Sequence, residues 1–119
     1  MNQRKNVILD LSYQFSLDII KIYDLLENKK SFSIANQLLK SGTSIGANIR
    51  EAQNAESKSD FIHKFKIAAK EAEETEYWLG LIKDSNKMKI EPIIFSKIKE
   101  LKAIINSIIS TSKRDIKKT

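Results

Sequence analysis

The sequence predicts an all-α protein, an antiparallel up-down-up-down four-helix bundle built as one domain over residues 1–119. Apolar side chains recur at intervals of three and four residues along most of the chain, which is the helical period. Glycine and proline, which interrupt helices, number only three and one. Short polar stretches break the apolar pattern at three places. Four helices joined by short turns are therefore expected, and short turns favour antiparallel neighbours.

The first helix is expected over residues 5–28. Its apolar positions follow the helical period: Ile8, Leu11, Phe15, Ile19, Ile22 and Leu26. The polar residues 28–30 form the turn, and Ser31 or Ser33 can cap the helix that follows, because a serine hydroxyl accepts from a free backbone N–H.

The second helix is expected over residues 31–55, although the stretch SGTSIGANIREA inside it holds two of the three glycines. Its apolar side chains keep the helical period: Ile34, Leu38, Ile45, Ile49 and Ala52. Gly42 falls on this apolar face and Gly46 lies off it. Each glycine costs a helix interior about 1 kcal/mol relative to alanine, so close contact with a neighbouring helix is the expected compensation. A kink or break near Gly42 is the alternative.

Small and polar side chains form a second line on the same helix: Ser41, Ser44, Asn48, Glu51 and Ala55. Small side chains let another helix approach closely. Asn48 and Glu51 are expected to form hydrogen bonds across that contact. Gly42, Ser44, Gly46, Asn48 and Glu51 are therefore predicted to make helix or subunit contacts.

The third and fourth helices are expected over residues 57–85 and 91–114. The third repeats apolar or small residues at alternating spacings of four and three: Phe61, Phe65, Ala68, Ala72, Thr75, Leu79 and Ile82. Ser57 and Ser59 are its candidate caps. Pro92 suits the first turn of the fourth helix, where a missing N–H is no loss. The pattern then continues: Ile94, Ile98, Leu101, Ile105 and Ile108.

A second line on the third helix mixes apolar and charged residues: Ile67, Glu71, Glu74, Trp78 and Leu81. Burying a carboxylate without a partner costs several kcal/mol, so Glu71 and Glu74 need partners across the bundle or in another subunit. Together with the small residues of the second helix, this favours a homo-oligomer in which Glu71, Glu74 and Trp78 make contacts. The alternative is one wide face whose glutamates reach water at its edge.

The formal net charge is +6, and the excess lies near the end of the sequence. Residues 87–119 carry nine basic and three acidic side chains. Lys97, Lys99 and Lys102, with Arg4 and Lys5, are predicted to contact the phosphates of a nucleic acid. Only three of the 21 basic residues are arginine, so the forked contacts typical of specific recognition are scarce. A solvated basic tail is the alternative.

Nothing in the sequence indicates catalysis or a cofactor. There is no cysteine, which excludes disulfides, thiolate zinc sites and a cysteine nucleophile. Helical di-metal sites need Glu-x-x-His on two helices, whereas the single His63 follows Asp60 at that spacing. The protein is expected to be no enzyme and to bind no metal. Its apolar runs fall far short of the roughly 20 residues that span a bilayer, so a cytoplasmic location without membrane contact is expected.

The central half of the chain resembles the "four helix bundle protein" family, also called the bacterial 23S rRNA intervening-sequence protein family. The matching pieces, in the family's order, are Gln37-Leu38, Ser44-Ile45, Asn48-Ile49 with Glu51, Asp60-Phe61-Ile62, and Ala68 through Glu74-Thr75 to Trp78-Leu79. The resemblance implies a structural role for Asn48, Glu51 and Glu74. The family often has alanine and then glycine where Arg50 and Ala52 stand here.

The resemblance also implies up-down bundles that assemble into ring-like homopentamers, some of them encoded within insertions of large-subunit rRNA genes. A related branch is the accessory protein of diversity-generating retroelements, a pentameric barrel that works with a reverse transcriptase. The leading hypothesis is a non-enzymatic cyclic homo-oligomer that binds structured RNA, such as rRNA, through a basic surface. The alternative is a protein-interaction scaffold, in which the residues around Tyr77 and Trp78 bind a partner such as a reverse transcriptase. A carboxylate metalloprotein is a distant third.

Overall fold

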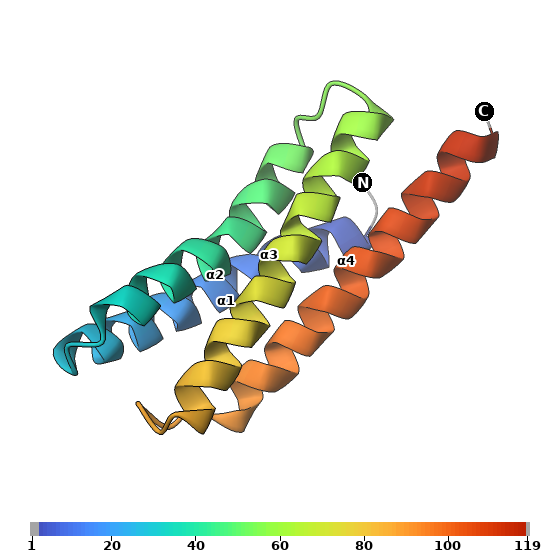
Figure 1. Ribbon diagram of the computed structural model, residues 1–119. Coiled ribbons are helices and arrows are strands. Elements are labelled where there is room, and N and C mark those ends of the chain that lie inside the picture. The colour runs from blue at the N-terminus through green and yellow to red at the C-terminus, as the bar shows by residue number, and fades with distance from the viewer. Residues whose placement is uncertain (1–2, 119) are drawn as a thin grey trace.

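The computed structural model describes residues 3–118 of the chain, with the side chains of residues 7–117. It contains four α-helices: α1 (Gln3–Asn28), α2 (Phe32–Ala52), α3 (Lys58–Asp84) and α4 (Pro92–Lys118). Consecutive helices run in opposite directions (Figure 1). The predicted all-α fold with four helices is therefore confirmed.

Each helix packs against its neighbours in the sequence, and α4 also packs against α1. Among the described residues, no Cα atoms of the diagonal pairs α1 with α3 and α2 with α4 lie within 8 Å of each other. The molecule is elongated, 52 × 23 × 19 Å. The α1–α2 turn and the α3–α4 loop lie at the same end of the molecule, and the α2–α3 loop lies at the other end (Figure 1).

Most predicted helix ends lie within two residues of the observed ones, but two helices end three or more residues away from the predicted boundary. The second helix ends at Ala52 rather than at residue 55, because Gln53, Asn54 and Ala55 donate their N–H groups three residues back and close a tight turn. The fourth helix continues beyond residue 114, where the partly buried Ile116 still packs against the core. The second helix is continuous through both glycines, so the alternative of a break near Gly42 is wrong.

One hydrophobic core runs through all four helices. Its largest fully buried side chains are Phe15, Phe65, Ile8, Ile19, Leu26, Leu38, Ile45, Ile49, Leu79, Ile82, Ile98 and Leu101. Burying a side chain of this kind contributes about 1.5–3 kcal/mol. Two buried hydroxyls are satisfied inside this core, since the Thr75 Oγ1 lies 2.9 Å from the Ser41 Oγ and 2.7 Å from the Glu71 carbonyl.

Local signals fix the ends of the helices. Ser57 caps α3, because its Oγ accepts from the Asp60 N–H at 3.0 Å. Lys30 and Asn86 follow α1 and α3 with left-handed φ values of 61° and 58°. Such a conformation costs a non-glycine residue roughly 1–2 kcal/mol, although asparagine tolerates it better. Both turns are therefore closed without glycine.

Candidate functional site

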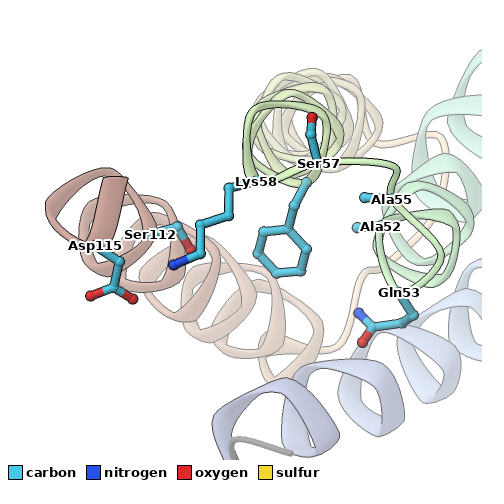
Figure 2. Close-up of a pocket in the computed structure, with 8 residues that line it drawn as sticks. Ala52, Gln53, Ala55, Ser57, Lys58, Ser112 and Asp115 are labelled. Carbon is cyan, nitrogen blue, oxygen red and sulfur yellow. The ribbon is translucent and has the colours of Figure 1, made fainter. Parts of the chain in front are cut away.

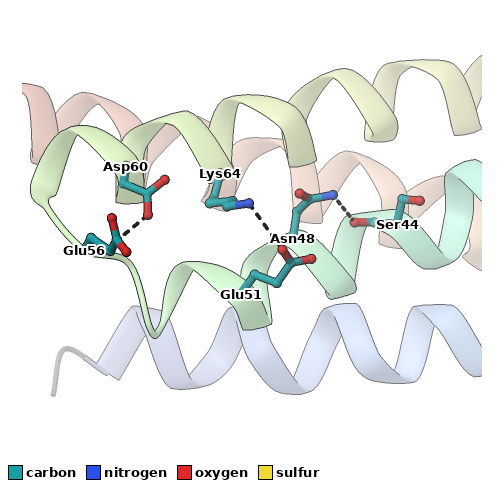
Figure 3. A network of polar contacts seen from close by, with 6 residues as sticks. All are labelled: Ser44, Asn48, Glu51, Glu56, Asp60 and Lys64. Carbon is teal, nitrogen blue, oxygen red and sulfur yellow. Dashed lines mark hydrogen bonds and ion pairs between the residues drawn. The ribbon is translucent and has the colours of Figure 1, made fainter.

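The polar side chains on α2 form hydrogen bonds and an ion pair mainly with groups of the same chain (Figure 3). Asn48 donates through Nδ2 to the Ser44 carbonyl at 2.8 Å, one turn back on its own helix. Ser44 donates to the Lys40 carbonyl at 2.6 Å. Glu51 does reach across to α3, where the Lys64 Nζ lies 3.2 Å from its Oε1. The expectation that both Asn48 and Glu51 bridge two helices is therefore wrong for Asn48, whose short amide bonds its own backbone.

The two glycines of α2 lie against α1. A Cβ at Gly42 would be 2.8 Å from both Cγ1 and Cγ2 of Ile19, and one at Gly46 would be 3.3 Å from the Ser12 carbonyl oxygen. Because real Cβ atoms essentially never come closer than 3.0 Å to such neighbours, the contact between α1 and α2 requires glycine at position 42. Both glycines thus make helix contacts inside the chain.

The acidic line on α3 lies at the surface. Glu71 is half-buried and Glu74 is exposed. Burial raises the pKa of Glu71 above its ordinary value of 4.5, the charge of Glu74 raises it further, and Lys40 partly opposes the shift. Trp78 is half-buried beside Tyr77, with ring centroids 5.2 Å apart. The Trp78 Nε1 is buried and has no hydrogen-bond partner among the residues that the structure describes.

Two of the three lysines of α4 that are predicted to contact phosphates form ion pairs with other helices. Lys97 lies 2.7 Å from Asp18 on α1. Lys102 lies 2.7 Å from Glu73 and 2.9 Å from Glu76 on α3, and hydrogen bonds to these two carboxylates raise its pKa. Lys99 is exposed. Lys97 and Lys102 each bridge two helices, so a phosphate would have to compete with these carboxylates, and their contact with phosphates stays a prediction.

Arg4 and Lys5 are also predicted to contact phosphates. Their side chains lie outside the described residues, so the structure places neither of them relative to the lysines of α4.

The structure groups four other lysines at one end of the bundle. Lys29 of the α1–α2 turn, Lys83 of the last turn of α3, and Lys87 and Lys89 of the α3–α4 loop line one cavity of about 540 Å³. We call this surface the lysine end. This surface was not predicted from the sequence, because the lysines of each helix were considered separately. The signal was available, since an up-down bundle brings its first and third turns to the same end.

An apolar groove runs along the outer side of α1 and α2. We call it the α1–α2 groove; its lining residues are Leu9, Asp10, Ser12, Tyr13, Ser16, Leu17, Ile20, Thr43, Gly46, Ala47 and Arg50. Its volume is about 930 Å³. Tyr13, Leu17 and Ile20 are 62%, 41% and 41% exposed. Large apolar side chains gathered in one groove are typical of a contact surface rather than of scattered surface residues.

A further cavity of about 490 Å³ lies at the opposite end (Figure 2). Ala52, Gln53 and Ser57 line it from the α2–α3 side, and Lys58 extends from α3 toward Asp115 on α4. Because it presents a cation and a carboxylate together, it favours neither an anion nor a cation as ligand.

Comparison with known proteins identifies the family. Residues 4–109 match the family described as 23S rRNA-intervening sequence protein. The chain belongs to this family. The resemblance noted in the sequence is thereby confirmed, and the match extends it from the central half of the chain into the first and fourth helices.

A solved structure supports the same conclusion for this member of the 23S rRNA-intervening sequence protein family. The chain is similar to a protein of unknown function from the S23 ribosomal protein family of Bacteroides thetaiotaomicron, with 43% sequence identity and a TM-score of 0.87. The alignment covers 91% of this chain and 99% of the other. A search of curated proteins found no match.

Two further observations describe this family member. Within residues 3–118, no helix is both long enough and apolar enough to cross a membrane. The same described residues contain no group of three or more His, Cys, Asp or Glu side chains that could hold a metal ion.

Replacing Glu71 by glutamine is expected to stabilise this family member at pH 7 by less than about 1 kcal/mol. Because the folded-state pKa of Glu71 is raised, protonation favours the folded state at low pH, and this contribution is lost as the pH rises through that pKa. The gain should therefore disappear below the ordinary pKa of 4.5. Urea unfolding at pH 7 and pH 4 measures it. Glu100→Gln, at an exposed position, is the control, and an equal gain for both variants would contradict the prediction.

Proposed function

We propose that this protein acts without catalysis, as a cyclic homo-oligomer of helical bundles that binds structured RNA through lysine side chains. The observation that supports self-association is the α1–α2 groove. Tyr13, Leu17 and Ile20 line it from α1 with exposed side chains, and small residues such as Gly46 and Ala47 line it from α2. An apolar groove beside small residues can accept another helix, as in helix-in-groove recognition.

A second copy of the chain is the occupant we propose for this groove. Another outward apolar surface lies on α3, where Tyr77 is 60% and Leu81 is 38% exposed. Because α1 and α3 are diagonal in the bundle, the two surfaces face different directions. Two different contact surfaces on one subunit give head-to-tail assembly, which closes into a ring when the rotation permits. A ring of five copies is the form that the family resemblance implies.

The RNA part of the proposal is supported by charge and by family. The net charge of +6 per chain is repeated in every copy, and repeated weak sites on one assembly bind with avidity. The family takes its description from sequences that intervene in 23S rRNA. A hairpin of ribosomal RNA is therefore the first ligand to test.

Titrating a labelled rRNA hairpin by fluorescence anisotropy tests this function. We expect a micromolar or lower Kd at low salt, with log K falling steeply as salt rises, because lysine contacts release counterions from phosphates. The hairpin should bind more tightly than an unstructured RNA of equal length. Absence of binding at low salt would contradict the RNA-binding function.

A protein-interaction scaffold is the second candidate function, and the exposed ring of Tyr77 beside Trp78 favours it. Aromatic side chains dominate the energetics of many protein interfaces. A complex with a purified reverse transcriptase that persists after nuclease treatment and in moderate salt, and that is lost in Tyr77→Ala, would support this role. Loss of the complex on nuclease treatment would point back to RNA.

A further inference from the structure

We propose that the lysine end is the site where this protein binds the phosphate backbone of RNA, an inference that rests on the RNA-binding function proposed above. Two parts of the chain that are far apart in the sequence supply its charge: the α1–α2 turn, and the end of α3 with the α3–α4 loop that follows it. Lys29, Lys83, Lys87 and Lys89 all line the same cavity of about 540 Å³. Lys30 directly follows Lys29 in the turn.

The lysines of this site are free of the ion pairs that occupy other lysines. Within the part of the chain that the structure describes, Lys64, Lys97 and Lys102 each lie within 3.2 Å of a carboxylate. The lysines of the lysine end form no such pair there. A lysine without a protein partner keeps its full charge available to a phosphate, whereas a paired one must first be separated from its carboxylate.

Acidic residues near the site do not neutralise it. Glu27, Asp84 and Glu91 lie in or beside the same two turns. Residues 27–30 and 83–91 therefore contain five lysines and three carboxylates. Asp84 and Glu91 are exposed, and neither forms an ion pair with a lysine of the site in the described structure. The local excess is therefore positive.

Helix dipoles do not account for this excess. Lysine is favourable at a helix C-terminus, where the dipole places about half a negative charge, and α1 and α3 both end here. However, α2 and α4 begin at the same end and present about half a positive charge each, so the four contributions nearly cancel. Moreover, Lys87 and Lys89 lie beyond the end of α3. The helix dipoles therefore do not explain why lysines gather at this end of the bundle.

The cavity also has an apolar part. Met88, Ile90 and Pro92 line the same cavity, and Ile90 is buried. The Lys83 Nζ lies 5.4 Å from the centre of the Phe95 ring, within range of a cation–π contact. Lysine stems lying on apolar surface keep their charged ends in water. Four lysine side chains that line one concavity can reach the closely spaced phosphates of a folded RNA.

The test compares two variants that lose the same number of charges. One carries Lys29→Gln, Lys83→Gln, Lys87→Gln and Lys89→Gln at the lysine end. The control replaces four exposed lysines elsewhere that form no ion pair in the described structure: Lys21, Lys66, Lys70 and Lys113. Both are titrated against the labelled rRNA hairpin over a salt series. Thermal unfolding of each checks that the exposed substitutions leave the fold intact.

We expect the lysine-end variant to bind at least about tenfold more weakly than the unmodified protein. Its log–log salt slope should flatten by about 2–3, since each lost phosphate contact removes about 0.7–0.9. The control should weaken binding by less than about threefold. A third variant with arginine at the same four positions should retain binding, because it keeps the charge.

The outcomes separate this inference from the function on which it rests. If the unmodified protein fails to bind RNA at low salt, both proposals are overturned. If it binds and the lysine-end variant binds equally well, or the control loses as much affinity, the site is wrong and the function stands. Competition by poly-glutamate as effective as that by the hairpin would show an acidic protein surface to be an equal ligand and would overturn the assignment to phosphate.

Discussion

Replacing Leu17 by glutamate is expected to reduce the mass of the protein in solution from that of an oligomer to that of a single 119-residue chain. Leu17 lines the α1–α2 groove and is 41% exposed in the isolated chain. A glutamate there reaches water in the monomer, but it would be buried without a partner in the assembled form, which costs several kcal/mol. Sedimentation velocity over a concentration series measures the change.

The control for this experiment is Gln14→Glu. It introduces the same charge on the same helix, at an exposed position outside the groove. The control should assemble like the unmodified protein. If Leu17→Glu keeps the mass of the unmodified oligomer, or if the unmodified protein is itself a single chain at high concentration, the proposed role of the groove is wrong.

Replacing Gly42 by alanine is expected to destabilise the fold by about 1–2 kcal/mol, the largest effect on stability that we predict for a single methyl group. Alanine favours a helix interior by up to about 1 kcal/mol over glycine, but the new Cβ would lie 2.8 Å from two carbons of Ile19. Ile19 is fully buried and branched at Cβ, so it cannot turn away. Overpacking of this kind costs about 1–3 kcal/mol, and α1 must move away from α2.

Gly80→Ala, by contrast, is expected to stabilise the fold. Gly80 lies inside α3, and a Cβ there would meet no heavy atom of the described residues within 4 Å beyond the adjacent backbone of its own helix. The helix-propensity gain is therefore unopposed, and the variant should be more stable by about 0.5–1 kcal/mol. Urea unfolding of both variants gives the comparison. A Gly42→Ala variant as stable as Gly80→Ala would contradict the close contact between α1 and α2.

The sequence predicted the architecture well because apolar periodicity determines it. Every apolar residue expected on the main face of α3 is buried, apart from the half-buried Phe61. Helix ends were less predictable. The polar residues after Ala52 are compatible with a helix, and only the observed turn hydrogen bonds show that α2 stops there. Local propensity could not decide between these two outcomes.

The candidate site was less predictable than the fold, because the role of a lysine depends on which carboxylate another helix places beside it. Lys97 and Asp18 are 79 residues apart and still form an ion pair. No local pattern shows that pairing. The lysine end, by contrast, follows from the predicted topology together with the lysines in two turns, so it was open to prediction once the turns were considered jointly.

The packing order of the helices has a consequence for how the chain folds. Within residues 3–118, three of the four helix pairs in contact join neighbours in the sequence, and only α1 with α4 joins distant segments. Topologies dominated by such local contacts fold rapidly, because little loop-closure entropy opposes them. We expect the first three helices to associate early and α4 to dock last against α1. The ion pair between Lys97 and Asp18 then closes the bundle, so substitutions there should chiefly accelerate unfolding and leave the folding rate unchanged.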